Sequence, residues 1–511
     1  MKKLSLVRML LMVVAAGVSL QVSAEYPINY EASLWGNAGS GDFAPYYIAS
    51  NRHGMLTQKA NALLRLGAWR EMDMSRRFSY GYGVGLVSGY GSETDYAIYS
   101  PITGRFDTHG ERPAYIWLQQ LYGEVKYRGV FMTVGLKEQQ SKMLNAELSS
   151  GDLIESGNSR PIPEVRAGFG DFQDIPFTDG WVQIDGEISY GKFTDDDYVR
   201  NHYNYYNYHI ATGSWYTYKQ AYFRTKPSER FSVTIGAQAA GIFGGTTDSY
   251  RNGRLVSSYK HPDGLGDFFE MFIPKNTSEE GFVLGNHLGS WDFMARYRLK
   301  NDDELKAYFQ WLWEDGSGIG KLNGFDGLWG LEYRNAHRGV VNGAVIEYLD
   351  FTNQSGPMHW DPEDNPGTTI TDQASGADSY YNNAFYNSYA NYGMSIGSPF
   401  MRAPIYNLDG YPAYVCTRVR GVHVGLTGNI SAPLDYRVMF GYRKGWGTSL
   451  VPMTRTLEDT SVSVDATYHV PSVQGLAIKA QVAMDKGSML GDNFGGLVTI
   501  SYNGIFNLGK K

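Results

Sequence analysis

Hydrophobic and polar residues alternate along many short stretches of this chain. The closing stretch is a clear example, because residues 497–506 read LVTISYNGIF and place Val498, Ile500 and Tyr502 on one side. A period of two predicts β-strands with one apolar and one polar face. The same alternation recurs at residues 78–86, 182–190, 231–239, 291–300, 305–313, 435–443, 461–470 and 476–485. Many of the apolar faces begin or end in Tyr, Phe or Trp, which is typical of the aromatic girdles of membrane barrels.

Long and short connections alternate between these stretches, as in outer-membrane barrels with tall outer loops and tight periplasmic turns. One gap in the alternation predicts a further strand at residues 164–170, followed by a turn through 171–178. With it, the chain is expected to form an all-β, transmembrane antiparallel β-barrel of about eighteen strands, with both termini in the periplasm. A barrel of that size encloses a lumen that its own wall side chains do not fill. A short helix is expected in the outer loop at 137–149, where apolar residues have helical spacing.

Residues 1–24 read as a secretory signal peptide, with Lys2, Lys3 and Arg8 in its basic region and a small-residue cleavage site at 22–24. The mature protein, residues 25–511, is expected to be a single barrel domain in the outer membrane of a Gram-negative bacterium. After the signal peptide no apolar run reaches about 18 residues, which excludes a helical membrane protein.

Composition and charge agree with an exported β-protein. The chain has 39 Tyr, 61 Gly and 24 Phe, a mixture rich in strand-forming aromatic residues. Its formal net charge is −7, and removal of the three basic residues of the signal peptide takes it to −10. Nucleic acid is therefore not an expected partner. The single cysteine, Cys416, has no second cysteine with which to form an internal disulfide.

The predicted polar strand faces would line the lumen with charges of both signs. The residues concerned are Asp185, Glu187, Asp292, Arg296, Arg437 and Asp465. An internal ion-pair network that stiffens the wall is the favoured interpretation, and a role in handling solutes is the alternative.

Two predicted outer loops, at 198–218 and 378–392, combine many aromatic rings with Asn side chains. Flat rings stack on the apolar face of a sugar, while amides supply donors and acceptors for its hydroxyls. The residues predicted to contact carbohydrate are Tyr203, Tyr205, Tyr206, Tyr208, Trp215, Tyr380, Tyr381 and Tyr386. Packing of the loops against one another explains the same composition, so both interpretations stay open.

Neither HExxH nor CxxC occurs in the sequence, and no enzymatic activity, cofactor or metal ion is expected. His469, on a polar face, is the best candidate for a general base, but a histidine with a structural role in the lumen is the favoured interpretation.

Two short motifs resemble a known family. Residues 50–54 read SNRHG and follow the first predicted strand, and residues 158–164 read NSRPIPE and lead into the strand predicted from the connections. Together with the signal peptide and the strand layout, these motifs look like those of the Wzi family of outer-membrane capsule-assembly proteins. The resemblance implies an eighteen-stranded barrel partly closed by its outer segments. It also implies a non-enzymatic, lectin-like protein that holds capsular polysaccharide at the cell surface.

The leading hypothesis is therefore an outer-membrane lectin-like protein that binds or anchors exported polysaccharide. Its expected partners are capsular or other surface polysaccharide and outer-membrane lipid. A porin-like channel for sugars or small solutes is the first alternative, and an outer-membrane hydrolase is the second.

Overall fold

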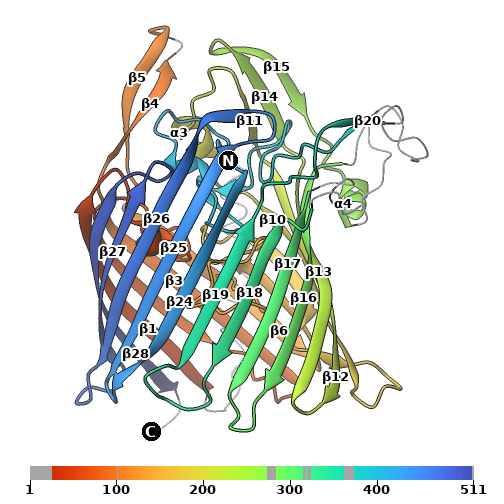
Figure 1. The fold of residues 1–511 in the computed structure, drawn as a ribbon, viewed down its shortest axis with the longest axis vertical. Coiled ribbons are helices and arrows are strands. Elements are labelled where there is room, and N and C mark those ends of the chain that lie inside the picture. The colour runs from red at the N-terminus through yellow and green to blue at the C-terminus, as the bar shows by residue number, and fades with distance from the viewer. Residues whose placement is uncertain are drawn as a thin grey trace.

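Eighteen antiparallel strands form a closed barrel (Figure 1). The computed structural model describes residues 26–508, except position 101 and residues 273–283, 315–317, 319–323 and 362–372. The barrel closes where the first strand pairs with the last, from Tyr26 opposite Leu508 to Ser40 opposite Phe494. This closure confirms the predicted fold class and strand number. The predicted signal peptide, residues 1–24, lies outside the described residues.

The barrel strands differ in length and are connected in chain order. They are β1 (Tyr26–Ser40), β2 (Asn61–Arg70), β3 (Phe78–Gly91), β6 (Ile116–Tyr127), β7 (Val130–Leu136), β8 (Glu164–Phe169), β10 (Val182–Lys192), β12 (Trp215–Ser228), β13 (Phe231–Phe243), β16 (Asn286–Arg298), β17 (Glu304–Trp313), β18 (Gly327–Arg334), β19 (Gly343–Asp350), β24 (Val419–Ser431), β25 (Leu434–Gly447), β26 (Pro452–His469), β27 (Leu476–Gly487) and β28 (Asn493–Leu508). A two-residue strand, β9 (Gln173–Asp174), pairs with β10 beside β8.

The other elements are short and lie in the long connections. The strands are β4 (Thr94–Ser100), β5 (Arg105–Glu111), β11 (His209–Thr212), β14 (Thr246–Arg251), β15 (Arg254–Lys260), β20 (His359–Asp361), β21 (Gln373–Ser375), β22 (Ala390–Asn391) and β23 (Met394–Ser395). The helices are α2 (Tyr46–Ala49), α3 (Asp196–His202), α4 (Leu265–Phe272) and the 3₁₀ turn η1 (Pro404–Tyr406). In the described part of the chain, no helix is long and apolar enough to cross a bilayer.

The long connections leave one end of the barrel, at the top of Figure 1, and short turns close the other end. This alternation depends on β8, which pairs with β7 on one side and β10 on the other. The strand predicted at 164–170 is therefore confirmed. Because outer-membrane barrels have their short turns in the periplasm, the end with the short turns is the periplasmic end.

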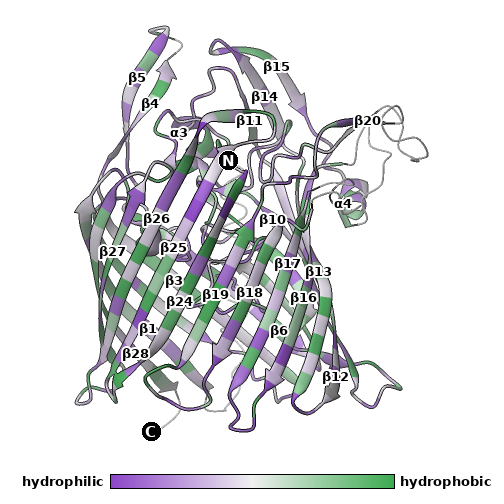
Figure 2. Ribbon diagram, viewed as in Figure 1, coloured by the Kyte–Doolittle hydropathy of each residue, from purple (hydrophilic) through white to green (hydrophobic). Residues whose placement is uncertain are grey.

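Hydrophobic and hydrophilic positions alternate along the strands of the barrel wall (Figure 2). On β28, Val498, Ile500 and Tyr502 are each more than 40% exposed, whereas Leu497 and Thr499 on the alternate face are buried. An exposed apolar belt is stable where it contacts hydrocarbon. The predicted orientation of the closing strand is confirmed.

The helix predicted at 137–149 does not form, because side chains in this segment hydrogen-bond to the nearby backbone. The Asn145 amide oxygen accepts hydrogen bonds from the N–H groups of Glu147 at 3.0 Å and Leu148 at 3.1 Å. Ser141 makes bonds of the same kind to the two N–H groups that follow at positions 143 and 144. Such bonds favour turns over helix. The helical spacing of the apolar residues reflects burial in the lumen instead, and the prediction was wrong.

Candidate functional site

Three outer connections fold into the barrel, and we call residues 41–60, 137–163 and 376–418 the plug. Their apolar side chains pack against inward-facing wall residues in two hydrophobic clusters. The first joins Leu153, Ile154, Tyr381 and Tyr389 of the plug to Leu312, Leu328 and Leu349 of the wall. The second joins Tyr47, Ile48 and Leu148 of the plug to Val345, Met439 and Leu497 of the wall. The wide lumen expected from the strand number is thus occupied by the chain's own loops.

Buried carboxylates attach the plug to the wall. Asp152 of the plug accepts hydrogen bonds from Gln238 of β13 at 3.2 Å and Gln310 of β17 at 2.9 Å. Glu347 of β19 accepts one from the backbone N–H of Ser150 at 2.7 Å. A buried carboxylate without such donors would be costly, so these bonds specify where the plug sits. Sequence reasoning missed both carboxylates because their partners lie more than 80 residues away.

The two motifs that resemble the Wzi family meet inside the barrel. The N–H of His53 donates to the carbonyl of Gly157, and the N–H of Gly54 donates to the carbonyl of Asn158, both at 2.8 Å. The Asn158 side chain also accepts a hydrogen bond from the N–H of Asn51 at 3.1 Å. The motifs therefore join two of the three plug segments to each other.

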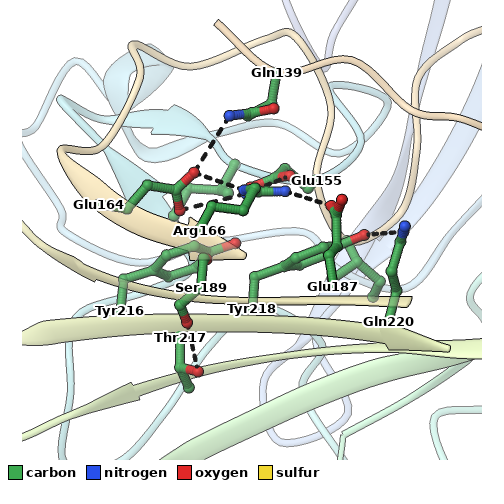
Figure 3. A network of polar contacts seen from close by, with 12 residues as sticks. Gln139, Glu155, Glu164, Arg166, Glu187, Ser189, Tyr216, Thr217, Tyr218 and Gln220 are labelled. Atoms are coloured by element: carbon green, nitrogen blue, oxygen red, sulfur yellow. Dashed lines mark hydrogen bonds and ion pairs between the residues drawn. The ribbon is translucent and has the colours of Figure 1, made fainter. Parts of the chain in front are cut away.

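An ion cluster centred on Arg166 of β8 holds another part of the plug (Figure 3). The guanidinium lies 2.7 Å from each of three carboxylates, those of Glu155, Glu164 and Glu187. None of the four side chains is more than 14% exposed. Burial raises the pKa of Glu155, in the plug, to about 7 although Arg166 opposes this shift, and the charge of Glu164 adds to it. The cluster holds more negative than positive charge, so its stability depends on Arg166.

The six charged residues predicted for the lumen form separate groups. Asp185 and Glu187 both pair with Lys142 of the plug, at 3.1 and 3.0 Å. Arg296 pairs with Glu304 on the neighbouring strand at 3.2 Å.

Asp292 is bonded by neutral donors, which include the Tyr222 hydroxyl at 2.7 Å. Arg437 pairs with Asp465 at 2.9 Å. These residues stabilise the wall and the plug at several places and do not form one continuous network.

Four of the eight aromatic residues predicted to contact sugar are buried. Tyr203, Tyr380, Tyr381 and Tyr386 are at most 3% exposed. The hydroxyl of Tyr380 donates to Asp326 at 3.1 Å, and that of Tyr381 donates to the Leu153 carbonyl at 2.5 Å. In this conformation their rings pack within the protein and offer no face to a ligand.

The other four, Tyr205, Tyr206, Tyr208 and Trp215, are partly exposed at the outer end. Three of them belong to a group of partly exposed rings that we call the outer aromatic cluster. Its members are Tyr99, Phe106, Tyr205, Tyr206, Tyr208, Tyr250 and Tyr411. Ring centroids are 4.5 Å apart for Tyr99 and Tyr206, 4.6 Å for Tyr205 and Tyr250, and 5.0 Å for Tyr208 and Tyr411.

Two hairpins and the 204–208 segment hold the outer aromatic cluster in place. The Asn252-Gly253 turn of the β14–β15 hairpin has positive φ at both positions, as a tight two-residue turn requires. A Cβ atom at Gly253 would lie 1.9 Å from the ring of Tyr99 in β4, so only glycine permits this contact. The Gly253 N–H donates to the Tyr206 carbonyl at 2.8 Å, and the Asn207 amide oxygen accepts from the Asn252 N–H at 2.7 Å.

Sequence reasoning missed the four cluster members outside the 198–218 loop. Tyr99 and Phe106 lie in another long connection and Tyr250 in a third, and nothing in their local pattern indicates that these loops meet. Tyr411 belongs to the plug. The one sequence signal for these residues was that aromatic rings occur near the tips of separate hairpins.

Two candidates for catalytic chemistry can be located in the structure. His469 is half exposed near a periplasmic turn and lies 2.9 Å from Asp435. The sequence Gly393-Met-Ser-Ile-Gly397 has the spacing of a hydrolase nucleophile motif, which requires a serine exposed between a strand and a helix. Ser395 is instead fully buried in the β22–β23 hairpin of the plug. Within the described ranges, no group of three or more His, Cys, Asp or Glu residues is arranged to hold a metal ion.

The closed wall, apolar belt and asymmetric ends define the fold of an outer-membrane β-barrel. Among solved structures, the chain is similar to Wzi of Escherichia coli, described as an outer-membrane protein involved in group 1 capsule assembly and a carbohydrate-binding β-barrel. The TM-score is 0.54 at 11% identity, over 96% of this chain and 86% of that one.

Two other solved barrels are also similar. They are OccAB2 of Acinetobacter baumannii, with TM-score 0.47, 9% identity and coverage of 94% and 98%, and OprD of Pseudomonas aeruginosa, with TM-score 0.43, 8% identity and coverage of 95% and 96%. At 11% identity, the similarity to Wzi shows a shared fold alone. No family model matches the sequence. No curated protein matches it either.

Proposed function

We propose that this chain is a non-enzymatic outer-membrane protein that binds exported, capsule-like polysaccharide at the cell surface. The observation that carries the proposal is the outer aromatic cluster, which combines partly exposed rings from separate hairpins above a plugged lumen. Such rings stack on sugars, and shallow contacts repeated along a polymer gain affinity together. The resemblance of the two plug motifs to the Wzi family supports the same function.

Removing three rings of the cluster tests the proposal. The variant Tyr205→Ala, Tyr206→Ala, Tyr208→Ala is expected to retain at least about tenfold less polysaccharide, because each lost stacking contact is worth about 0.5–1.5 kcal/mol. The measurement is cell-bound against released polysaccharide in the source strain with its own gene replaced. Folding is followed by heat-modified gel mobility.

The matched control is Tyr297→Ala, a tyrosine 45% exposed near the periplasmic end of β16. It should leave retention unchanged. If the triple variant reaches the surface, folds and retains as much polysaccharide as the unaltered protein, the cluster is not the binding site. New protease sensitivity of the outer loops without loss of polysaccharide would identify these rings as packing residues.

A channel for small solutes is the competing function, and conductance distinguishes it. Since the plug packs against the wall, the intact protein in planar bilayers is expected to pass little current. β19 and β24 are neighbours and pair at Asp350 and Arg420, so a short Gly-Ser linker can replace residues 352–418. That variant should pass a larger current. Steady porin-scale conductance from the intact protein would favour the channel instead.

A further inference from the structure

A cavity of about 230 Å³ lies in the lumen between the plug and the barrel wall. The lining residues that bear on its chemistry are Trp35, Arg52, Arg65, Glu147, Arg437 and Lys479. Arg437 and Lys479 are each the fourth residue of a strand that starts at a short turn. These two side chains therefore place the cavity on the periplasmic side of the plug.

Positive charge predominates among the lining side chains. Four of them are cationic, Arg52, Arg65, Arg437 and Lys479, and one, Glu147, is a carboxylate. Arg65 is neutralised from outside the cavity by Glu138 at 2.9 Å and Glu31 at 3.7 Å. The other three cations, Arg52, Arg437 and Lys479, account for the remaining excess of positive charge.

Two of these three cations share one carboxylate, and the third has none within ion-pair distance among the residues that the structure describes. Asp465 lies 2.9 Å from Arg437 and 3.0 Å from Lys479. Arg52 donates to the neutral Gln481 amide at 2.5 Å and, among the described residues, lies within 4 Å of no carboxylate. Burial and the nearby charge of Arg437 together lower the pKa of Arg52 to about 10, although the charge of Asp465 opposes this shift, so the group is still cationic at neutral pH.

An arginine held inside a protein without an acidic partner is unfavourable unless a ligand supplies the negative charge. A guanidinium binds a carboxylate through two parallel hydrogen bonds, and the neighbouring lysine adds a third donor. The Arg52 guanidinium lies over the Trp35 ring, 5.5 Å from its centroid, so an apolar ring adjoins the cations. Pockets for drug-sized ligands measure roughly 300–1,000 Å³, so this smaller cavity suits a ligand with a single ring.

We propose that Arg52, Arg437 and Lys479 form a binding site for the carboxylate of a single-ring sugar acid that enters from the periplasmic side. Trp35 stacks on the ring of the ligand, and the carboxylate faces the three cations. This site is separate from the outer aromatic cluster and does not depend on the proposed surface function.

The test is calorimetric titration of the purified full-length mature barrel in detergent with D-glucuronate, D-glucose and inorganic phosphate. Glucuronate is expected to bind at least roughly tenfold more tightly than glucose or phosphate, because only it combines a ring with a carboxylate. Arg52→Gln should weaken glucuronate binding by about tenfold or more, since a hydrogen bond to a charged group is lost. Its thermal midpoint should not fall, because the variant removes an unpaired cation.

The matched control is Arg296→Gln, a lumen arginine that is paired with Glu304 and does not line the cavity; it should bind glucuronate as the unaltered protein does. If Arg52→Gln does not fold, glucuronate binding is measured with Lys479→Gln in its place. The proposal is overturned if glucose or phosphate binds as tightly as glucuronate. It is also overturned if glucuronate does not bind at millimolar concentration, or if the Arg52 or Lys479 variant keeps full affinity.

Discussion

Replacing Arg166 with Met is expected to lower the free energy of unfolding by about 3–5 kcal/mol. Removal of one partner from a buried ion cluster leaves uncompensated charge in a medium of low polarity. Here three carboxylates, Glu155, Glu164 and Glu187, would lose the one cation that contacts all of them. The loss is measured by urea unfolding of the barrel in lipid vesicles. Hydrogen exchange should also show faster exchange in residues 137–163, because Glu155 belongs to that plug segment.

The matched control is Arg296→Met, whose ion pair with Glu304 is partly exposed. Partly exposed pairs contribute about 0–1 kcal/mol, so this variant should lose little. Adding Glu155→Gln and Glu187→Gln to the Arg166 variant should restore part of its stability, because the repelling charges are then removed. Equal losses in the Arg166 and Arg296 variants would contradict the central role assigned to the cluster.

Substitution of Val464 by Arg should cost about 2–4 kcal/mol, the penalty for a cation near the bilayer midplane on the lipid face of a barrel. Val464 on β26 is 52% exposed, and its neighbours across both adjacent strands are Val438 and Val482. It lies four residues from Tyr468 at the periplasmic end of the strand. At about 3.3 Å per residue and a tilt of about 40°, this places it roughly 10 Å into the bilayer.

Tyr468→Arg is the control, since it changes the same face of the same strand at the interface. There the cost should be about 0–1 kcal/mol. Both variants are compared by urea unfolding in vesicles and by heat-modified gel mobility. If the two substitutions have equal effects, the depth assigned to β26 is wrong.

Alternation of apolar and polar residues was sufficient to predict the barrel. On the closing strand β28, it correctly separated Val498 and Ile500, which face outward, from Thr499, which faces inward. The regular alternation of long and short connections also located β8. Both patterns are local, because a strand between lipid and lumen imposes a period of two and a hairpin barrel imposes two kinds of connection.

The candidate site was predicted only in part. Tyr205 and Tyr381 come from segments of nearly the same composition, yet the first is partly exposed in the outer aromatic cluster and the second is buried in the plug. The composition of a loop indicates which chemical groups it carries. It does not indicate whether the loop folds into the lumen or stays at the outer surface. Tyr99 and Phe106 were missed for the same reason, since they approach Tyr206 only through the meeting of two hairpins.

The amino-acid pattern alone was thus enough to specify a transmembrane barrel with an apolar outer surface, because each strand meets lipid and lumen independently of distant residues. The contents of that barrel depend on contacts between segments far apart in the chain. Asp152 bonds to Gln238 and Gln310, and Arg52 comes to lie beside Arg437 and Lys479, only because loops of tens of residues fold back into the lumen. Long-range packing of those loops, which leaves no periodic trace in the sequence, decides which rings face outward and where charge remains unpaired.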